Sequence, residues 1–220
     1  MTAMKLYNFW RSGTSHRLRI ALNLKGLPTE YVAIHLGKEA HLTEAFKGIN
    51  PQQLVPALLI EDAGSERVLT QSPAIIEWLE EEFPEPALLP RDHLGRAKVR
   101  ALAALVGCDI HPVNNRRILE YIRKQFGAND EAVNAWCGTW ITAGFDAYEA
   151  LLATGGQRGR FSHGSAPTIA DVYLIPQVES ARRFKVDLAQ WPRILEIESA
   201  CLDLDAFKYA APALQPDAVW

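Results

Sequence analysis

Four consecutive small residues, Ser12, Gly13, Thr14 and Ser15, lie between a predicted strand and a predicted helix, and three of them carry hydroxyl groups. The first amides of a helix have no partners within the helix, and the helix dipole favours negative charge at that end. Hydroxyl groups at such a position can donate hydrogen bonds to an anion, so the stretch has the chemistry of an anion-binding site. The alternative is an ordinary N-cap, for which any of these hydroxyls would serve.

The elements on either side of this turn follow from their residue types. Residues 5–10 (KLYNFW) are rich in large apolar and aromatic side chains, which is typical of a strand. After the turn, apolar residues recur with helical spacing as far as Lys25, and Gly26 followed by Pro28 predicts the end of that helix. A strand, a hydroxyl-rich turn and a helix are therefore expected in this order.

The next elements continue the alternation of strand and helix. Residues 30–35 predict a second strand, and residues 41–47 a short helix that Gly48 ends in a left-handed conformation. The step from Val55 to Pro56 leads into an apolar strand, although proline cannot donate to a β-ladder. A cis peptide bond between Val55 and Pro56 at a tight turn explains this arrangement.

The first third of the chain ends with a strand and a helix. Residues 67–70 predict the strand, and Ser72 and Pro73 are expected to be the N-cap and the first residue of the helix. The predicted order of elements is therefore βαβ–α–ββα. Prolines at 84, 86 and 90 then mark a linker, after which the sequence is almost continuously helical. We expect one domain over residues 1–86 and an all-helical domain over residues 91–220.

Within the helical half, a long helix is predicted over residues 130–152, with Gly155 and Gly156 ending it. Thr168 and Asp171 have the spacing of a capping box that opens another helix. A last helix is expected from Pro192 to about residue 207, and the tail over 212–220 is expected to be poorly ordered.

Composition narrows the classes of function. The chain has 220 residues and a formal net charge of −3, which argues against a broad nucleic-acid surface. No apolar run is long enough to span a bilayer, and the opening residues lack the blocks of a secretory signal, so a cytoplasmic protein is expected. Cys108, Cys137 and Cys201 lie far apart and are expected to be reduced and mostly buried. One close pair, Cys108 and His111, is too little for a metal site.

Residues 11–22 (RSGTSHRLRIAL) resemble the RSSCxxRVRIAL signature of the zeta class of glutathione transferases. NPxxxVP at 50–56, QSxAIIEWLEE at 71–81 and PQVxxAxRFxVDL at 176–188 are also similar to that class. The likeness covers almost the whole chain. One departure is that Gly13 and Thr14 stand where the signature has its second serine and its cysteine, so activities that need that cysteine are put in doubt.

The resemblance implies an α/β, thioredoxin-like N-terminal domain and an all-α C-terminal domain, which together are the glutathione transferase fold. It also implies a homodimer, with glutathione as a cofactor that is regenerated. The implied activity is the cis–trans isomerisation of maleylacetoacetate, or of maleylpyruvate in bacterial relatives. Addition of the glutathione sulfur makes the double bond temporarily single, and the resulting enolate rotates and then expels the sulfur.

The glutathione thiol must ionise for this reaction, and a free thiol has a pKa of about 8.5. A hydroxyl donor and a helix N-terminus both stabilise the thiolate and lower that pKa. Ser12 is expected to be the hydroxyl donor and thus a catalytic residue, with Thr14 and Ser15 as alternatives.

The tripeptide also needs anchors. With Pro56 cis, the backbone of Val55 can pair with the cysteinyl unit as a strand would. Gln71 and Ser72 can hold the γ-glutamyl carboxylate at the start of their helix. His41 is expected at the glycyl end, the alternative being an ordinary surface histidine. The full set of expected cofactor-binding residues is Ser12, Gly13, Thr14, Ser15, His41, Gln53, Val55, Pro56, Gln71, Ser72, His111 and Asn115.

Both implied substrates are dianions with a carboxylate at each end, and arginine suits carboxylates better than lysine does. Arg11, Arg117 and Arg183 are expected to converge on this dicarboxylate substrate and to stabilise its enolate, as catalytic residues. The alternative for each is a solvated arginine on a helix face, and Arg116 and Arg182 are expected to be of that kind.

Other functions stay open. Glutathione conjugation or dehalogenation of small electrophiles would use the same thiolate, but a site for such substrates is expected to lack three converging arginines. A non-catalytic glutathione-binding or assembly protein is a second alternative, although Ser12, Gln71 and Ser72 are all retained. A thioredoxin-like oxidoreductase lacks support, since the turn at 12–15 contains no cysteine.

Overall fold

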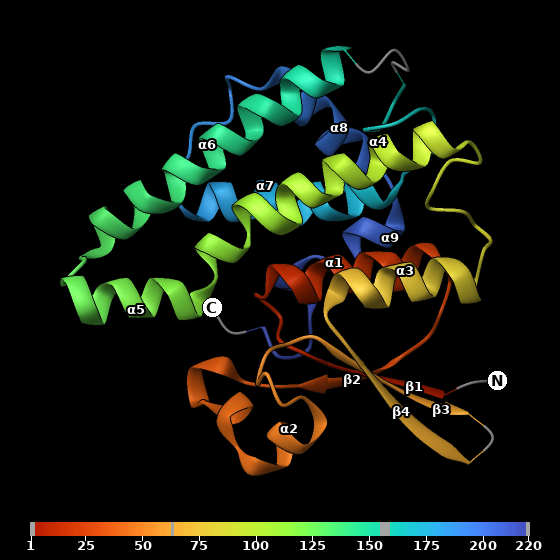
Figure 1. Ribbon diagram of the computed structural model, residues 1–220, viewed down its shortest axis with the longest axis vertical. Helices are drawn as coiled ribbons and strands as arrows, with labels where there is room; N and C mark the ends of the chain where they lie inside the picture. Colours follow the sequence, from red (N-terminus) through yellow and green to blue (C-terminus); the bar gives the residue numbers. More distant parts are fainter. Residues whose placement is uncertain (1–2, 63, 155–158, 219–220) are drawn as a thin grey trace. The chain divides into compact units, whose positions relative to one another are not determined.

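The computed structural model describes residues 3–62, 64–154 and 159–218 (Figure 1). The chain divides into two units, one made of Met1–Ala87 and Leu204–Trp220 and the other of Leu88–Asp203. The division at 87/88 falls within the proline-rich linker. The residues from 204 onward group with the first unit, whereas the sequence placed them in the second domain.

A four-stranded sheet forms the centre of the first unit. Its strands are β1 (Ala3–Asn8), β2 (Glu30–Ala33), β3 (Ala57–Asp62) and β4 (Ser65–Thr70), in the order β2-β1-β3-β4. β1 pairs with β2 in parallel, Lys5 facing Glu30, and with β3 antiparallel, Lys5 facing Leu59. The predicted strands over 5–10, 30–35 and 67–70 are confirmed apart from their ends.

Helices cover both sides of this sheet. α1 (Gly13–Leu24) and α3 (Ser72–Glu82) pack against each other over one face, and α2 (Glu44–Ile49) lies on the other side (Figure 1). Leu18, Leu58 and Ile75 are buried in the core between the sheet and the helix pair. The predicted order βαβ–α–ββα is confirmed, with two 3₁₀ turns, Leu36–Lys38 and Ala40–Leu42, before α2.

The end of α2 differs from the prediction. Gly48 lies inside this helix and not at a left-handed terminus; Asn50 is the C-cap, with an extended φ of −135°. The N–H of Asn50 donates to the carbonyl of Phe46 at 2.8 Å, and its side-chain amide donates to the carbonyl of Leu54 at 2.7 Å. Asn50 thus ends the helix and turns the chain towards Val55, so the prediction for Gly48 was wrong.

The C-terminal segment is ordered as far as the structure describes it. The predicted last helix is two helices, α8 (Pro192–Leu202) in the second unit and α9 (Asp205–Lys208) in the first, where α9 packs on α1 (Figure 1). A 3₁₀ turn at Pro212–Leu214 follows, and Asp217 is 8% exposed. The expectation of a poorly ordered tail was therefore wrong over residues 212–218, because Asp217 is held by hydrogen bonds to the first unit.

All the secondary structure described in the second unit is helical. Its helices are α4 (His93–Ala104), a π-helical stretch at Leu105–Ile110, a 3₁₀ turn at Pro112–Asn114, α5 (Arg116–Phe126), α6 (Asp130–Thr154), α7 (Ile169–Arg183) and α8. α7 contacts α4, α6 and α8, and its residues from Ile169 to Val178 are all buried. Phe145 of α6 packs edge-on against Trp191, with ring centroids 5.1 Å apart. The long helix predicted over 130–152 is confirmed, whereas Gly155 and Gly156 lie outside the described residues.

The predicted capping box at the start of α7 is confirmed. The carboxylate of Asp171 accepts hydrogen bonds from the N–H of Thr168 at 2.7 Å and from its hydroxyl at 3.0 Å. It also accepts one from the N–H of Ser162 at 2.8 Å. Burial raises the pKa of Asp171, and the hydrogen bonds from Ser162 and Thr168 oppose that rise. This fully buried carboxylate therefore holds the loop before α7 onto the helix.

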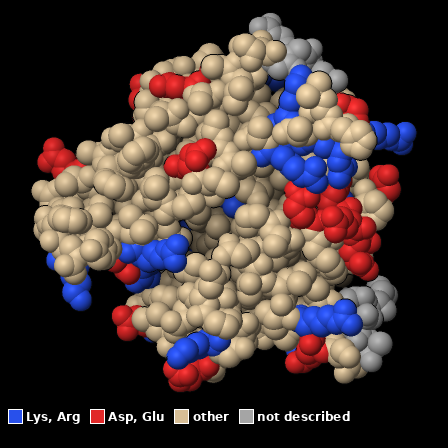
Figure 2. Space-filling model, viewed as in Figure 1, with Lys and Arg blue, Asp and Glu red and all other residues tan. Residues whose placement is uncertain are grey.

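Charged groups of both signs are mixed on the surface. Figure 2 shows basic and acidic side chains beside one another on the visible face. Charged side chains of opposite sign also form ion pairs, such as Lys5–Glu61 at 2.9 Å. Within the described residues, no helix is long and apolar enough to cross a membrane. Nor does that part of the chain contain a group of three or more His, Cys, Asp or Glu side chains that could hold a metal ion.

Candidate active site

The turn before α1 is organised by two serines. Ser12 is the N-cap of α1, and its Oγ accepts a hydrogen bond from the N–H of Ser15 at 3.3 Å. The hydroxyl oxygen of Ser15 accepts from the N–H of Phe9, also at 3.3 Å. Ser15 is fully buried, whereas Ser12 and Thr14 are half-buried. Of the three predicted hydroxyl donors, Ser15 therefore serves the turn itself, and Ser12 and Thr14 are the ones that a ligand can reach.

Ser12, Thr14 and Val55 form a chain of hydrogen bonds. The hydroxyl oxygens of Ser12 and Thr14 lie 2.9 Å apart, and the Thr14 hydroxyl donates to the backbone carbonyl of Val55 at 3.0 Å. The structure thus brings three of the predicted cofactor-binding residues together, from segments 41 positions apart in the sequence. The next predicted residue, Pro56, follows Val55 through a cis peptide bond, as predicted.

The loop that carries Val55 is fixed by Asn50. In addition to its bond to Leu54, the Asn50 side chain accepts from the N–H of Gln52 at 3.1 Å. The backbone carbonyl of Asn50 accepts from the N–H of Gln53 at 2.8 Å. Gln53, a predicted cofactor-binding residue, has a positive φ of 57°. The asparagine of the NPxxxVP pattern therefore fixes the conformation of this loop by hydrogen bonds, although Asn50 was not among the predicted site residues.

Gln71 and Ser72 lie at the amino end of α3, and the N-cap of this helix is Gln71 and not Ser72. Gln71 is the N-cap residue of α3 and has a φ of 67° and a ψ of 107°, a conformation that side-chain-bearing residues rarely adopt. Its side-chain amide donates to the side-chain oxygen of Gln52 at 2.5 Å. Ser72 is the first residue of the helix, so the prediction that Ser72 is the N-cap was wrong. The buried Ser72 hydroxyl instead accepts from the guanidinium of Arg17 at 3.2 Å.

The backbone of Trp10, directly before Arg11, is held on both sides. Its N–H donates to the carboxylate of Asp217 at 3.2 Å, and its carbonyl accepts from the guanidinium of Arg19 at 3.0 Å. Asp217 also accepts a hydrogen bond from the hydroxyl of Tyr31. Burial and this contact with Asp217 raise the pKa of Tyr31, so the phenol stays a neutral donor. The sequence offered no signal for Asp217, because its role depends on residues far along the chain.

Three further predicted residues lie in the first unit. Arg11 is exposed, and its guanidinium carbon lies 5.7 Å from the centre of the Trp10 ring. His41 is half-buried in the 3₁₀ turn Ala40–Leu42. Gly13 is the first residue of α1.

His111, Asn115 and Arg117 lie where the second unit changes helix direction. His111 follows the π-helical stretch, and Asn115 is the N-cap of α5, where its side-chain oxygen accepts from the N–H of Arg117 at 3.1 Å. The Arg117 side chain is exposed and, among the described residues, has no carboxylate partner. Arg116 instead pairs with Glu120 one turn later. Arg116 is therefore an exposed arginine, as predicted, although it forms an ion pair, and the role of Arg117 in binding substrate stays a prediction.

Arg182 and Arg183 end α7 and also differ. Arg182 makes a two-pronged ion pair with Glu198 of α8, whose side chain is 9% exposed, so Arg182 is a structural partner rather than a merely solvated one. The guanidinium of Arg183 lies 4.9 Å from the centre of the Phe184 ring and donates to the hydroxyl of Ser180 at 3.1 Å. Arg117 and Arg183 belong to the second unit and Arg11 to the first, so their convergence on one substrate stays a prediction.

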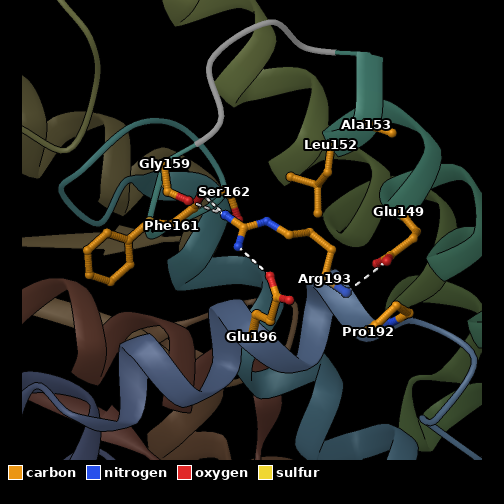
Figure 3. A pocket seen from close by; sticks show the side chains of 9 residues that line it. All are labelled: Glu149, Leu152, Ala153, Gly159, Phe161, Ser162, Pro192, Arg193 and Glu196. Carbon is orange, nitrogen blue, oxygen red and sulfur yellow. Dashed lines mark hydrogen bonds and ion pairs between the residues drawn. The ribbon is translucent and has the colours of Figure 1, made fainter.

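The second unit contains a cavity of about 450 Å³ that none of the predicted site residues lines (Figure 3). The guanidinium of Arg193 crosses it, pairs with Glu196 at 2.8 Å and donates to the carbonyl of Phe161 at 3.3 Å. Glu149 accepts from the N–H of Arg193 at 2.8 Å at the start of α8. The charged groups here are bound to one another and to the backbone, which is typical of a structural network.

Two family models match the chain. The N-terminal domain of glutathione S-transferase matches residues 11–82, and the C-terminal domain of glutathione S-transferase matches residues 130–198. The first match contains the turn at Ser12, the loop at Val55 and the start of α3. The second contains α6, α7 and Arg183.

The chain is similar over almost its whole length to several maleylpyruvate and maleylacetoacetate isomerases, including solved structures. It is 72% identical to a maleylpyruvate isomerase of a Ralstonia species, over 97% of this chain and 99% of that protein. A solved holo structure of a maleylpyruvate isomerase, described as a bacterial zeta-class glutathione S-transferase, superposes with a TM-score of 0.94 at 71% identity, covering 98% of this chain and 100% of that one. A maleylacetoacetate isomerase of Anaeromyxobacter dehalogenans, solved with glutathione in its active site, superposes with a TM-score of 0.90 at 42% identity, covering 99% of each chain.

Proposed function

The chain belongs to the zeta class of the glutathione transferase family, and we propose that it is a glutathione-dependent cis–trans isomerase that converts maleylpyruvate to fumarylpyruvate. Conversion of maleylacetoacetate to fumarylacetoacetate is the alternative form of the same reaction. The observation that carries the proposal is the pair of hydroxyls, Ser12 and Thr14, at the start of α1 beside the carbonyl of Val55. The identity of 72% with a maleylpyruvate isomerase supports the choice of substrate.

The residues of the first unit fit glutathione. The half-buried Ser12 hydroxyl and the amino end of α1 supply the donors that a thiolate needs, with the Thr14 hydroxyl beside Ser12. At the amino end of α3, Ser72 accepts from Arg17, so its own hydroxyl proton can be donated to a carboxylate. Gln71, held in a rare conformation beside Ser72, can bind the same γ-glutamyl group.

The remaining anchors complete the proposed cofactor site. The backbone of Val55 pairs with the cysteinyl unit, and His41 and Gln53 bind the glycyl end. We also assign His111 and Asn115 to glutathione binding, as the class implies. Because Asn115 already caps α5 through its oxygen, we assign the ligand contact to its side-chain NH₂ group.

Bound glutathione supplies the nucleophilic sulfur that adds reversibly to the activated double bond, so that rotation about it becomes possible. Ser12 donates its hydroxyl proton towards the sulfur and thereby favours the ionised form at neutral pH. Arg11, Arg117 and Arg183 bind the two carboxylates and the carbonyl oxygen on which negative charge develops. A planar guanidinium suits these groups because it donates two parallel hydrogen bonds.

The test is to mix the purified protein with maleylpyruvate, with and without glutathione, and to follow loss of the cis enol by absorbance. We expect turnover only with glutathione present, and a thiol titration afterwards is expected to find all the glutathione unconsumed. Net loss of thiol would indicate a conjugating transferase instead. Glutathione binding without turnover of either maleyl substrate would indicate a non-catalytic binding protein. The ratio of kcat/KM for the two substrates decides between them.

We further propose that the protein works as a homodimer in the cytoplasm, as its class implies. Sedimentation equilibrium of the purified chain tests the dimer, and a mass of one chain at micromolar concentration would contradict it. Cell fractionation tests the compartment.

A further inference from the structure

We propose that Thr14 is a positioning residue that couples the docking of the tripeptide backbone at Val55 to ionisation of the thiol beside Ser12. The inference rests on the proposed function, since it concerns how the same site handles glutathione. It starts from the hydrogen-bond chain in which Thr14 lies between the Val55 carbonyl, at 3.0 Å, and the Ser12 hydroxyl, at 2.9 Å.

The direction of each hydrogen bond in this chain follows from the number of protons. A carbonyl oxygen only accepts, so the bond between Thr14 and Val55 uses the one hydroxyl proton of Thr14. In the contact between Ser12 and Thr14, the donor must then be Ser12. The oxygen of Ser12 meanwhile accepts from the N–H of Ser15. Without a ligand, the proton of Ser12 therefore points at Thr14 and not towards the place where a sulfur would bind.

A ligand amide reverses this chain. When the cysteinyl N–H of glutathione donates to the carbonyl of Val55, it competes with the hydroxyl of Thr14 for that acceptor. Thr14 can then rotate its proton to the oxygen of Ser12, and Ser12 can turn its own proton to the sulfur. Hydrogen bonds in such a chain polarise one another, so a Ser12 hydroxyl that accepts from Thr14 is a stronger donor to the thiolate. The thiol proton itself leaves to solvent.

The alternative arrangement makes the opposite prediction. A carbonyl has two lone pairs, so Val55 could accept from the ligand and from Thr14 together. Thr14 would then remain an acceptor that competes with the sulfur for the proton of Ser12. In that case, removing the Thr14 hydroxyl would free Ser12 and lower the pKa of the bound thiol. The coupling that we propose requires that the same change raise it.

The experiment compares the unsubstituted protein with Thr14→Val, which has a similar shape without the hydroxyl, and with Thr14→Ser, which keeps the hydroxyl. The pKa of the bound glutathione thiol is measured from thiolate absorbance during a pH titration at saturating glutathione. We expect Thr14→Val to raise that pKa, so that the thiolate fraction at neutral pH falls about three- to tenfold, as the loss of one hydrogen bond implies. Thr14→Ser is expected to restore the lower pKa. If Thr14→Val does not fold, Thr14→Ala takes its place, and the same rise in the thiol pKa is expected.

Binding of S-methylglutathione, which has no ionisable thiol, provides the second measurement. We expect Thr14→Val to bind it at least as tightly as the unsubstituted protein does, because the Val55 carbonyl then has no competing hydroxyl donor. An unchanged or lowered thiol pKa in Thr14→Val would overturn the coupling, as would a Thr14→Ser that behaves like Thr14→Val. A parallel loss of S-methylglutathione affinity would assign Thr14 to general binding and would also overturn it. If the unsubstituted protein binds no glutathione, the proposed function itself fails, which is a separate result.

Discussion

The carboxylate of Asp217 accepts a hydrogen bond from the backbone N–H of Trp10 at 3.2 Å, although 207 positions separate the two residues. It also accepts from the hydroxyl of Tyr31, and Arg19 holds the carbonyl of Trp10 at 3.0 Å. Both polar groups of the Trp10 main chain are therefore held, directly before Arg11. The C-terminal segment thus fixes the backbone from which the predicted catalytic residues begin.

Replacing Asp217 tests this role of the C-terminal segment. Asp217→Ala leaves the half-buried Trp10 N–H and Tyr31 hydroxyl without their acceptor, and donors left unsatisfied and shielded from water cost about 1–3 kcal/mol. We expect that loss in urea unfolding, and glutathione binding weaker by about three- to tenfold because the turn at 10–12 is less well fixed. Asp217→Asn is expected to lose less, since an amide retains one acceptor and adds donors.

The matched control for Asp217 is Asp205→Ala in the same segment. The Asp205 side chain is 74% exposed and pairs only loosely with Lys208, at 3.7 Å. Exposed pairs of this kind are worth little, so we expect a change below about 0.5 kcal/mol and unchanged glutathione affinity. If Asp217→Ala were as silent as Asp205→Ala, the tail would have no part in fixing the site.

Local patterns in the sequence predicted much of this fold because the interactions behind them are local. The pairing of Thr168 with Asp171 spans three residues, and the cis bond before Pro56 follows from proline chemistry next to a strand. Ser12 could be predicted to lie at the start of a helix because the strand and helix patterns on either side of it are local. The same local reasoning failed for the N-cap of α3, which is Gln71 and not Ser72. The Ser72 hydroxyl instead accepts a hydrogen bond from the buried guanidinium of Arg17, 55 positions away.

The missing parts of the candidate site depend on contacts between distant segments. Nothing near Asp217 in the sequence indicates that it binds Trp10, and the approach of Thr14 to Val55 needs the strands to be paired first. The positive φ of Gln71 is likewise imposed by its surroundings, since glutamine has no local preference for it. The convergence of the three arginines stays a prediction that only substitution of each can test.

The cysteines give a test based on pKa. Burial raises the pKa of the Cys137 thiol to about 11, against the opposing positive charges of Arg183 and Arg123, and burial also raises that of Cys201. Cys108 is exposed. The thiolate is the reactive form, so at about pH 8 we expect an alkylating reagent to modify Cys108 alone in the folded protein. Mass spectrometry of digested samples measures this.

The expected pH dependence of this labelling has a definite sign. Raising the pH towards about 11 increases the thiolate fraction of Cys137, so its modification is expected to rise with pH while the protein stays folded. In guanidinium chloride, all three cysteines are expected to react. Equal labelling of Cys137 and Cys108 in the folded protein at about pH 8 would contradict the burial of Cys137.

Arg117 and Arg116 form a matched pair on α5. Arg117→Ala is expected to lower kcat/KM for maleylpyruvate about 10- to 100-fold, the worth of charge-assisted hydrogen bonds to a carboxylate. Arg117→Lys is expected to recover part of this, since it keeps the charge but not the planar fork. Arg116→Ala, which loses only an exposed pair with Glu120, is expected to leave kcat/KM unchanged. Unchanged kcat/KM in Arg117→Ala would remove Arg117 from the site.

Arg182 and Arg183 are adjacent in α7, and we expect their substitutions to affect different properties. Arg182→Ala leaves the carboxylate of Glu198, 9% exposed, without its partner. Because the Arg182 side chain is 50% exposed, water can replace part of the ion pair, and we expect a loss of about 1–2 kcal/mol in urea unfolding. Turnover at a temperature where the variant stays folded is expected to be unaffected.

Arg183→Ala is expected to have the opposite profile. The Arg183 side chain is exposed, its guanidinium lies over the ring of Phe184, and it donates to the hydroxyl of Ser180. Contacts of an exposed side chain are worth little, so stability is expected to change by less than about 1 kcal/mol. If Arg183 binds a substrate carboxylate, kcat/KM falls about 10- to 100-fold while the affinity for glutathione alone is retained. A loss of stability without a loss of kcat/KM would make Arg183 a structural residue like Arg182, and the substrate would then be bound by the other two arginines alone.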